Sequence, residues 1–260
     1  MYLHRIYFYA MFTAFTATMP AAAHSVCDAR SGPKTTALVE LYTSEGCSSC
    51  PPADRQLSQL RQVLDPVAEV VPLALHVDYW DSIGWKDPYA QALFGERQSR
   101  LVSANRQKTV YTPQYFISGT ETRSGQSELR KLVVRINALP AAADIRLQVG
   151  AKGNRALALI ADATVTDTKS PALLYLAITE SGLVSNVTRG ENKGVTLAHD
   201  YVVRAWIGPI QLTNGVARVE RELVLPAEWS RAQLDVIAFV QAEHDGKVLQ
   251  ALRAQHCAGS

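Results

Sequence analysis

Hydrophobic positions divide the chain into two parts with different rhythms. In the first part, short apolar runs at residues 36–42, 70–77 and 115–118 have the pattern of buried strands. Between and after them, segments beginning near 51, 88 and 129 place apolar side chains at helical spacing. This alternation of strands and helices predicts an α/β layer built on a mostly buried sheet.

From residue 144 onward, the pattern is one of strand after strand. Dipeptides that suit tight hairpins, such as Asn214-Gly215 and Asp245-Gly246, lie between several of these runs. The second part therefore predicts an antiparallel β-sandwich, and we expect two domains, over 24–140 and 141–260. The predicted strands are 145–149, 156–160, 173–178, 216–225, 234–241 and 248–252.

Residues 1–23 have the pattern of a secretory signal peptide. A weakly basic start precedes an apolar run over 6–17, and three alanines at 21–23 resemble a cleavage site. The apolar run is shorter than the roughly 20 residues that a membrane-spanning helix needs. We therefore expect cleavage near Ala23, no stable membrane anchor, and an exported protein that is periplasmic or secreted. Such a compartment is oxidising, so disulfides persist there.

Composition and charge exclude several classes of protein. Hydrophobic residues make up 47% of the chain, and the net charge is only +2. This combination argues against disorder, which requires low hydrophobicity and high net charge. The chain also lacks the strong basic character that is typical of nucleic-acid-binding proteins. We expect no nucleic-acid partner and no cofactor; the sequence does not specify an oligomeric state.

The chemically informative feature is a Cys-x-x-Cys pair, Cys47 and Cys50. The pair follows a predicted strand and precedes a predicted helix, and Pro51 and Pro52 suit the first turn of that helix. A helix N-terminus stabilises a thiolate through its free N–H groups and partial positive charge. Because the thiolate is the attacking species in disulfide exchange, we expect Cys47 to be the more exposed nucleophile and Cys50 to resolve the mixed disulfide.

Other roles for the same cysteines remain open at this point. The pair could be an inert structural disulfide, although so small a loop adds little entropic stability. It could contribute to a zinc site, but a Cys₄ site needs a second nearby pair. It could also bind a soft metal completed by His76, as in metal delivery. A further alternative is a non-catalytic binding module whose β-rich half recognises a protein or a glycan.

The residues around the pair resemble a known family. The segment 39–50 resembles the central strand and active site of the thioredoxin superfamily. Residues 40–55, with 76–81, 84–88 and 111–114, are more closely similar to the exported family called domain of unknown function 1223. In the second half, 191–194 and 197–204 fit the same family. The resemblance implies an α/β thioredoxin-like N-terminal domain followed by an all-β sandwich-like C-terminal domain, and it implies no substrate.

Three further residues are candidates for the same site. Thioredoxin-type folds carry a cis-proline loop that faces the cysteine pair, so the resemblance implies this role for Thr112 and Pro113; an ordinary trans turn is the alternative. Glu40 lies in an apolar strand, where a buried carboxylate could relay the proton of Cys50. Its alternative is a solvent-facing or edge position.

The remaining cysteines, Cys27 and Cys257, lie near the ends of the expected mature chain. Because the termini of a domain are often close together, we predict a structural disulfide between them; two unpaired thiols are the alternative. Our leading hypothesis for the whole chain is an exported thiol–disulfide oxidoreductase that acts through Cys47 and Cys50 on protein thiols or disulfides.

Overall fold

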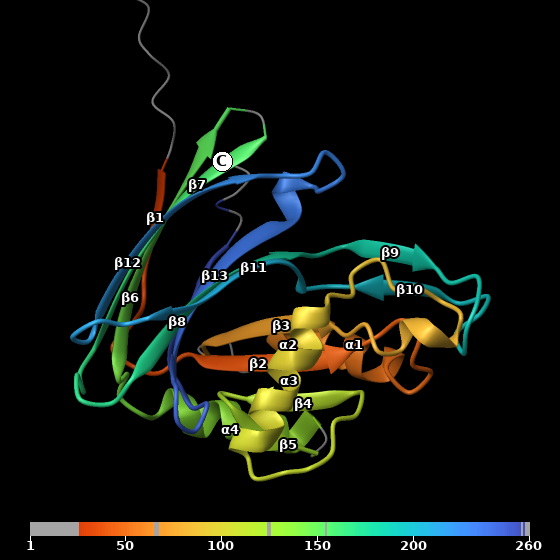
Figure 1. Ribbon diagram of the computed structural model, residues 1–260, viewed down its shortest axis with the longest axis horizontal. Coiled ribbons are helices and arrows are strands. Elements are labelled where there is room, and N and C mark those ends of the chain that lie inside the picture. The colour runs from red at the N-terminus through yellow and green to blue at the C-terminus, as the bar shows by residue number, and fades with distance from the viewer. Residues whose placement is uncertain (1–25, 65–67, 124–125, 154, 256, 258–260) are drawn as a thin grey trace, which may run out of the picture.

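A computed structural model describes residues 26–64, 68–123, 126–153, 155–255 and 257. The predicted signal peptide, residues 1–23, lies outside the described residues. Within the described part of the chain, no helix is long and apolar enough to cross a membrane. Figure 1 shows the arrangement of the strands and helices.

The first half alternates strands with helices. The strand β2 is buried along its whole length, and α1 begins at Pro51, where a proline in the first turn leaves no hydrogen bond unmade. In chain order, the elements are β1 (Val26–Arg30), β2 (Ala37–Thr43), α1 (Pro51–Ser58), α2 (Leu60–Val63), β3 (Val70–His76), the 3₁₀ helix η1 (Asp81–Ile83), α3 (Ala92–Ala104), β4 (Gln114–Ile117), β5 (Thr120–Thr122) and α4 (Gln126–Asn137).

The second half consists almost entirely of strands. In β6 and β7, buried side chains alternate with more exposed ones, as expected for a sheet with one face on the core. The elements are β6 (Ala143–Lys152), β7 (Ala156–Val165), β8 (Ala172–Glu180), β9 (Leu183–Asn186), β10 (Thr196–His199), β11 (Val202–Gln211), β12 (Val216–Val224), the 3₁₀ helix η2 (Arg231–Gln233), β13 (Leu234–Ala242) and β14 (Val248–Ala254).

One large sheet contains strands from both halves of the chain. Its order is β14-β13-β8-β11-β3-β2-β4-β5. The two halves meet where β11 lies parallel to β3, with Val202 opposite Ala74, and the N–H of Ala74 donates to the carbonyl of Tyr201 at 2.8 Å. The sheet that the first half begins is thus continued by strands of the second.

The predicted fold class is therefore wrong. Far more of the described residues lie in strands than in helices, and the strands of the first half do not form an α/β thioredoxin-like domain of their own. The physical reason is that β3 has backbone groups that need partners on both sides. Its second partner is β11, from beyond residue 200. Hydrophobic periodicity identifies such strands but does not reveal their pairing.

A second sheet, β1-β6-β7-β12, faces one end of the large sheet, as the left side of Figure 1 shows. Aliphatic side chains from both sheets meet in one buried cluster, including Leu147 and Leu159 from the smaller sheet and Leu176 and Val236 from the larger. Their burial away from water stabilises this β-sandwich.

Helices cover both faces of the large sheet around β2. Because successive side chains of a strand point to opposite faces, Val39 and Leu41 contact a cluster formed with α1 and α4, while Leu38 and Tyr42 contact a cluster that includes α3. The end of β2 is thereby enclosed, and the turn that follows it has a fixed position.

A disulfide joins Cys27, in β1, to Cys257, just after β14, with 5.6 Å between the Cα atoms. The two cysteines are 230 residues apart in sequence. In the chain-entropy model, a cross-link across so long a loop restricts the unfolded chain strongly. The bridge therefore ties the smaller sheet of the sandwich to the edge of the large sheet.

We predict that replacing both Cys27 and Cys257 by serine lowers the free energy of unfolding by about 3–5 kcal/mol, because the unfolded chain regains the freedom that the bridge removes. Denaturant unfolding of the variant and the parent protein measures the difference. Equal midpoints with equal slopes would contradict a stabilising role for this bridge.

Candidate functional site

The cysteine pair lies in the turn between β2 and α1. Cys47 and Cys50 form a disulfide with 5.4 Å between their Cα atoms, and the carbonyl of Cys50 accepts the first backbone hydrogen bonds of α1. The chain passes very close to Trp80 here: a Cβ atom on Gly46 would lie 3.1 Å from Trp80 Cβ. A glycine before Cys47 is what permits this approach.

Both cysteines are buried, with exposed fractions of 0%. The expectation that Cys47 is the more exposed of the two is therefore wrong. The exposed residues of the turn are Ser48 and Ser49, and the hydroxyl of Ser49 lies 3.3 Å from Cys47 Sγ. Side chains and backbone from other segments cover the sulfur atoms, and sequence spacing does not show such a cover.

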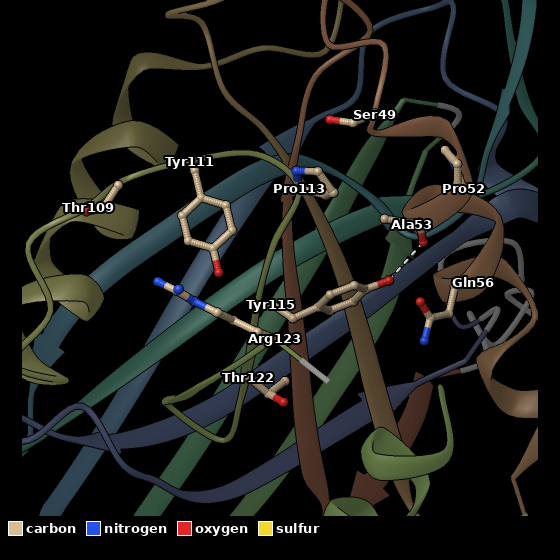
Figure 2. Close-up of a pocket in the computed structure, with 10 residues that line it drawn as sticks. All are labelled: Ser49, Pro52, Ala53, Gln56, Thr109, Tyr111, Pro113, Tyr115, Thr122 and Arg123. Atoms are coloured by element: carbon tan, nitrogen blue, oxygen red, sulfur yellow. Dashed lines mark hydrogen bonds between the residues drawn. The ribbon is translucent and has the colours of Figure 1, made fainter. Parts of the chain in front are cut away.

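The loop before β4 places a cis proline near this turn. The peptide bond between Thr112 and Pro113 is cis, and β4 then pairs with β2 so that Gln114 lies opposite Tyr42. The hydroxyl of Thr112 accepts a hydrogen bond from the indole N–H of Trp80 at 2.7 Å. Pro113 and Ser49 line the same pocket, so the proline loop and the cysteine turn share one surface (Figure 2).

A hairpin from the second half covers the cysteine turn. Strands β9 and β10 pair with each other, and the loop between them reaches the turn. The side-chain amide of Asn192 donates to the carbonyl of Glu45 at 2.8 Å and to that of Cys47 at 3.0 Å. The N–H of Ser48 donates to the carboxylate of Glu191 at 2.9 Å. These contacts hold the backbone around Cys47 from outside the first half.

Glu45, two residues before Cys47, is fully buried. One carboxylate oxygen accepts from the indole N–H of Trp85 at 2.7 Å, and the other lies 3.1 Å from His199 Nε2. Burying a charged group is costly unless it is paired and hydrogen-bonded. Sequence reasoning missed this role because the partners come from positions 40 and 154 residues further along the chain.

A second buried pair lies beside the first. His76 Nδ1 is 2.7 Å from Asp87, whose carboxylate also accepts from the backbone N–H groups of Glu45 and Tyr89. Burial lowers the pKa of His76, but the charge and hydrogen bond of Asp87 outweigh it, so this pKa lies above its ordinary value. Burial likewise raises the pKa of Asp87, but the charge and hydrogen bond of His76 outweigh this effect, so the pKa of Asp87 lies below its ordinary value.

Buried polar side chains gather around Asp54: those of Thr43, His76 and His199 interact with its carboxyl. In the described part of the chain, His76 Nε2 and His199 Nδ1 have no hydrogen-bond partner. The His76 and His199 rings are 5.0 Å apart, and their charges influence the pKa of Asp54, which burial raises overall. Asp54 lies one helical turn after Cys50. A buried carboxyl with a raised pKa at this place is suited to exchanging a proton with a thiol.

The structure gives no cluster of ligands for a metal. Among the described residues, no group of three or more histidine, cysteine, aspartate or glutamate side chains is arranged to hold a metal ion. His76, the third ligand in the alternative of a soft-metal site, is bonded to Asp87 through Nδ1.

Glu40 is buried in β2 and is paired with an arginine. Its side chain points to the face of β2 opposite α1, where it accepts from Arg97 Nε at 2.6 Å and from the hydroxyl of Tyr42 at 3.2 Å. The guanidinium of Arg97 also lies 4.9 Å from the ring centres of Tyr175 and Trp206. Glu40 therefore neutralises a buried arginine and does not contact the cysteines in the structure.

We predict that Asp87→Asn removes a pH dependence of stability. The stabilising effect of the raised His76 pKa is complete below its unfolded value, near 6.5, and is lost as the pH rises through the folded value. Without the carboxylate, the free energy of unfolding no longer falls as the pH rises above 6.5. At pH 6 it is about 3 kcal/mol lower in the variant than in the parent protein.

Denaturant unfolding between pH 5 and 9 measures both effects. The exposed Asp144, on β6, provides a matched control, since Asp144→Asn removes the same charge outside the site. An Asp87→Asn protein with the pH profile of the parent protein would be inconsistent with the pairing.

We also predict that Asn192→Ala makes the Cys47–Cys50 disulfide easier to reach. Each of the two hydrogen bonds of Asn192 contributes about 1 kcal/mol, so their loss favours opening of the covering loop. Reduction by dithiothreitol should become up to about thirtyfold faster, which corresponds to the loss of about 2 kcal/mol. Asn186→Ala, an exposed position on the same hairpin, should leave the rate unchanged; equal rates for all three proteins would rule out this gating role.

Comparison with solved structures identifies relatives of the fold. Protein AGR_C_4864 from Agrobacterium tumefaciens is similar with a TM-score of 0.61 and 22% identity, over 87% of this chain and 96% of that one. HBP35 of Porphyromonas gingivalis is similar with a TM-score of 0.69 and 14% identity, over 86% of this chain and 76% of that one. At these identities the likeness is one of fold alone.

No curated protein matches the chain. A family model does: the model described as "Protein of unknown function (DUF1223)" matches residues 38–241. This range begins in β2, includes both cysteines of the site and the loop that covers them, and ends in β13. Because the match spans well over half of the chain, the protein belongs to the DUF1223 family.

Proposed function

We propose that this protein is a thiol–disulfide oxidoreductase that exchanges the Cys47–Cys50 disulfide with protein thiols. The observation that carries the proposal is the position of this disulfide, at the start of α1 and close to the loop of Pro113. The partial positive charge at the start of α1 stabilises a thiolate formed there. Pro51 and Pro52 supply no N–H to it, and the N–H groups of Ala53 and Asp54 donate to the carbonyl of Cys50. The proposed likeness to the thioredoxin superfamily concerns this site and not the architecture of the domain.

The exchange proceeds in two steps. A substrate thiolate attacks the sulfur of Cys47, a new bond forms between these two sulfurs, and the Cys47–Cys50 bond breaks to leave a thiolate on Cys50. A second substrate thiolate then attacks the substrate sulfur of this mixed disulfide and releases Cys47. Two electrons pass from the substrate, which becomes a disulfide, to the protein, which becomes a dithiol; the reverse sequence reduces a substrate disulfide.

The thiolate on Cys50 needs a proton when the dithiol forms, and Asp54 is the proposed donor. It is almost fully buried, lies one turn after Cys50 on α1, and has a pKa that burial raises. A carboxyl with a raised pKa near a thiolate can donate a proton during reduction and accept one during oxidation. His76, whose pKa is raised by its bond to Asp87, is the proposed group that exchanges protons with Asp54.

Export remains part of the proposal. It rests on the signal-peptide pattern of residues 1–23, and it is consistent with a chain that carries two disulfides. The absence of a nucleic-acid partner and of a membrane anchor also remain predictions from the sequence.

A trapping experiment tests the proposed function. In the Cys50→Ser variant, Cys47 forms mixed disulfides with substrate proteins but has no neighbour to release them, so stable adducts are expected. The matched Cys47→Ser variant should form far fewer, because it lacks the attacking thiol. The reduction potential of the parent protein is measured alongside and is expected above about −300 mV, the region below which stable structural bridges lie. A potential far below that value, with no adduct in either variant, would falsify the proposal.

A further inference from the structure

A pocket of about 630 Å³ opens beside the cysteine turn. Residues from three segments surround it: the cysteine turn with α1, the loop before β4 with β4 itself, and the end of β5 with the residue that follows it (Figure 2). Ser49 links the pocket to the disulfide, because it lines the pocket and its hydroxyl lies 3.3 Å from the buried Cys47 Sγ. The lining residues are Ser49, Pro52, Ala53, Gln56, Thr109, Tyr111, Pro113, Tyr115, Thr122 and Arg123.

The walls of the pocket are held in place before any ligand binds. The hydroxyl of Tyr115 donates to the carbonyl of Ala53 at 2.8 Å, as Figure 2 shows. The hydroxyl of Tyr111 donates to Glu121 at 2.7 Å. With Pro113 between them, these rings form a rigid surface that is apolar on its faces and polar at its edges. Such a surface binds a ligand without a large loss of side-chain entropy.

The charge at the rim of this pocket is positive. Arg123 follows β5, the edge strand of the large sheet, and its side chain is 68% exposed. Its guanidinium lies 5.2 Å from the ring centre of Tyr111, and its Nε atom is 3.4 Å from Glu121. Glu121 itself is only 8% exposed, and one of its oxygens accepts from Tyr111, Gln114 and Arg123.

The exposed end of Arg123 therefore faces solvent, whereas its carboxylate partner is covered. Lys108, also exposed, precedes the lining residue Thr109. Among the described residues that line the pocket, none is an aspartate or a glutamate. A ligand with a negative charge would thus meet a cation held against an aromatic ring, with no opposing carboxylate in the lining.

We propose that this pocket binds an extended segment of the substrate protein next to its reacting cysteine, and that Arg123 selects segments with a carboxylate side chain. This inference rests on the proposed oxidoreductase function. A volume of about 630 Å³ is in the usual range for a ligand site, roughly 300–1,000 Å³, and accommodates a few residues at about 3.3 Å each. Tyr111 and Pro113 form the surface for the segment, and Arg123 is the specificity-determining residue.

The test uses the reduced protein and synthetic peptides that contain one cysteine as a mixed disulfide with 2-thiopyridine. The Cys47 thiolate attacks the peptide sulfur, and 2-thiopyridone leaves; its absorbance reports the rate. Cys50 then attacks Cys47, which re-forms the protein disulfide and releases the peptide thiol. The peptides carry glutamate, glutamine or lysine at each position within three residues of the cysteine.

At low salt, the best glutamate peptide is expected to react about fivefold faster than its lysine counterpart, since an exposed ion pair contributes up to about 1 kcal/mol. Arg123→Glu should reverse this preference, and added salt should weaken it. The matched control is Arg221→Glu, which makes the same charge change at an exposed position of β12 in the smaller sheet. It should retain the preference of the parent protein.

The outcomes separate the two proposals. If the peptides react at equal rates regardless of charge, or if Arg123→Glu and Arg221→Glu shift the preference equally, the role of Arg123 is refuted while the oxidoreductase function stands. If no peptide releases thiopyridone faster with the parent protein than with the Cys47→Ser variant, the proposed function fails, and the inference about the pocket fails with it.

Discussion

The parallel pairing of β11 with β3 is the constraint on which the arrangement of this molecule depends. It is a short contact, centred on Val202 opposite Ala74, yet it makes one sheet from strands that lie far apart in the sequence. The hairpin of β9 and β10 comes just before β11, so the pairing also fixes that hairpin above the cysteine turn. His199 and Asn192 reach the first half only because of this connection.

That arrangement buries several charged groups close to one disulfide. Glu45 and Asp87 each have a histidine partner, and the two imidazole rings are themselves neighbours. Buried charges without such partners would strongly disfavour folding. Each of these groups therefore offsets the free-energy cost of burying its partner. Removing one of them leaves the other buried without a partner. Asp54, with its raised pKa, sits within this network at the first turn of α1.

Local features of the chain were predictable from the sequence, and distant pairings were not. The runs at 36–42 and 70–77 predicted β2 and β3, because a buried strand is continuously apolar. The prolines at 51 and 52 predicted where α1 begins. The burial of Glu45 could not be predicted, since its partners Trp85 and His199 are brought to it by tertiary contacts. For the same reason, the partner of Glu40 could not be predicted, because nothing local reveals Arg97.

The two disulfides differ in what their loss would mean for the fold. In the chain-entropy model, stabilisation grows with the logarithm of the loop length, from about 2 kcal/mol for a bridge across three residues to about 5 kcal/mol across 230. Opening the Cys47–Cys50 bond therefore removes little of the constraint on the unfolded chain. The packing of β2 and α1 and the contacts of Asn192 hold the turn in place by other means. A bond that the fold does not need for its stability is free to take part in chemistry, whereas the Cys27–Cys257 bond is not.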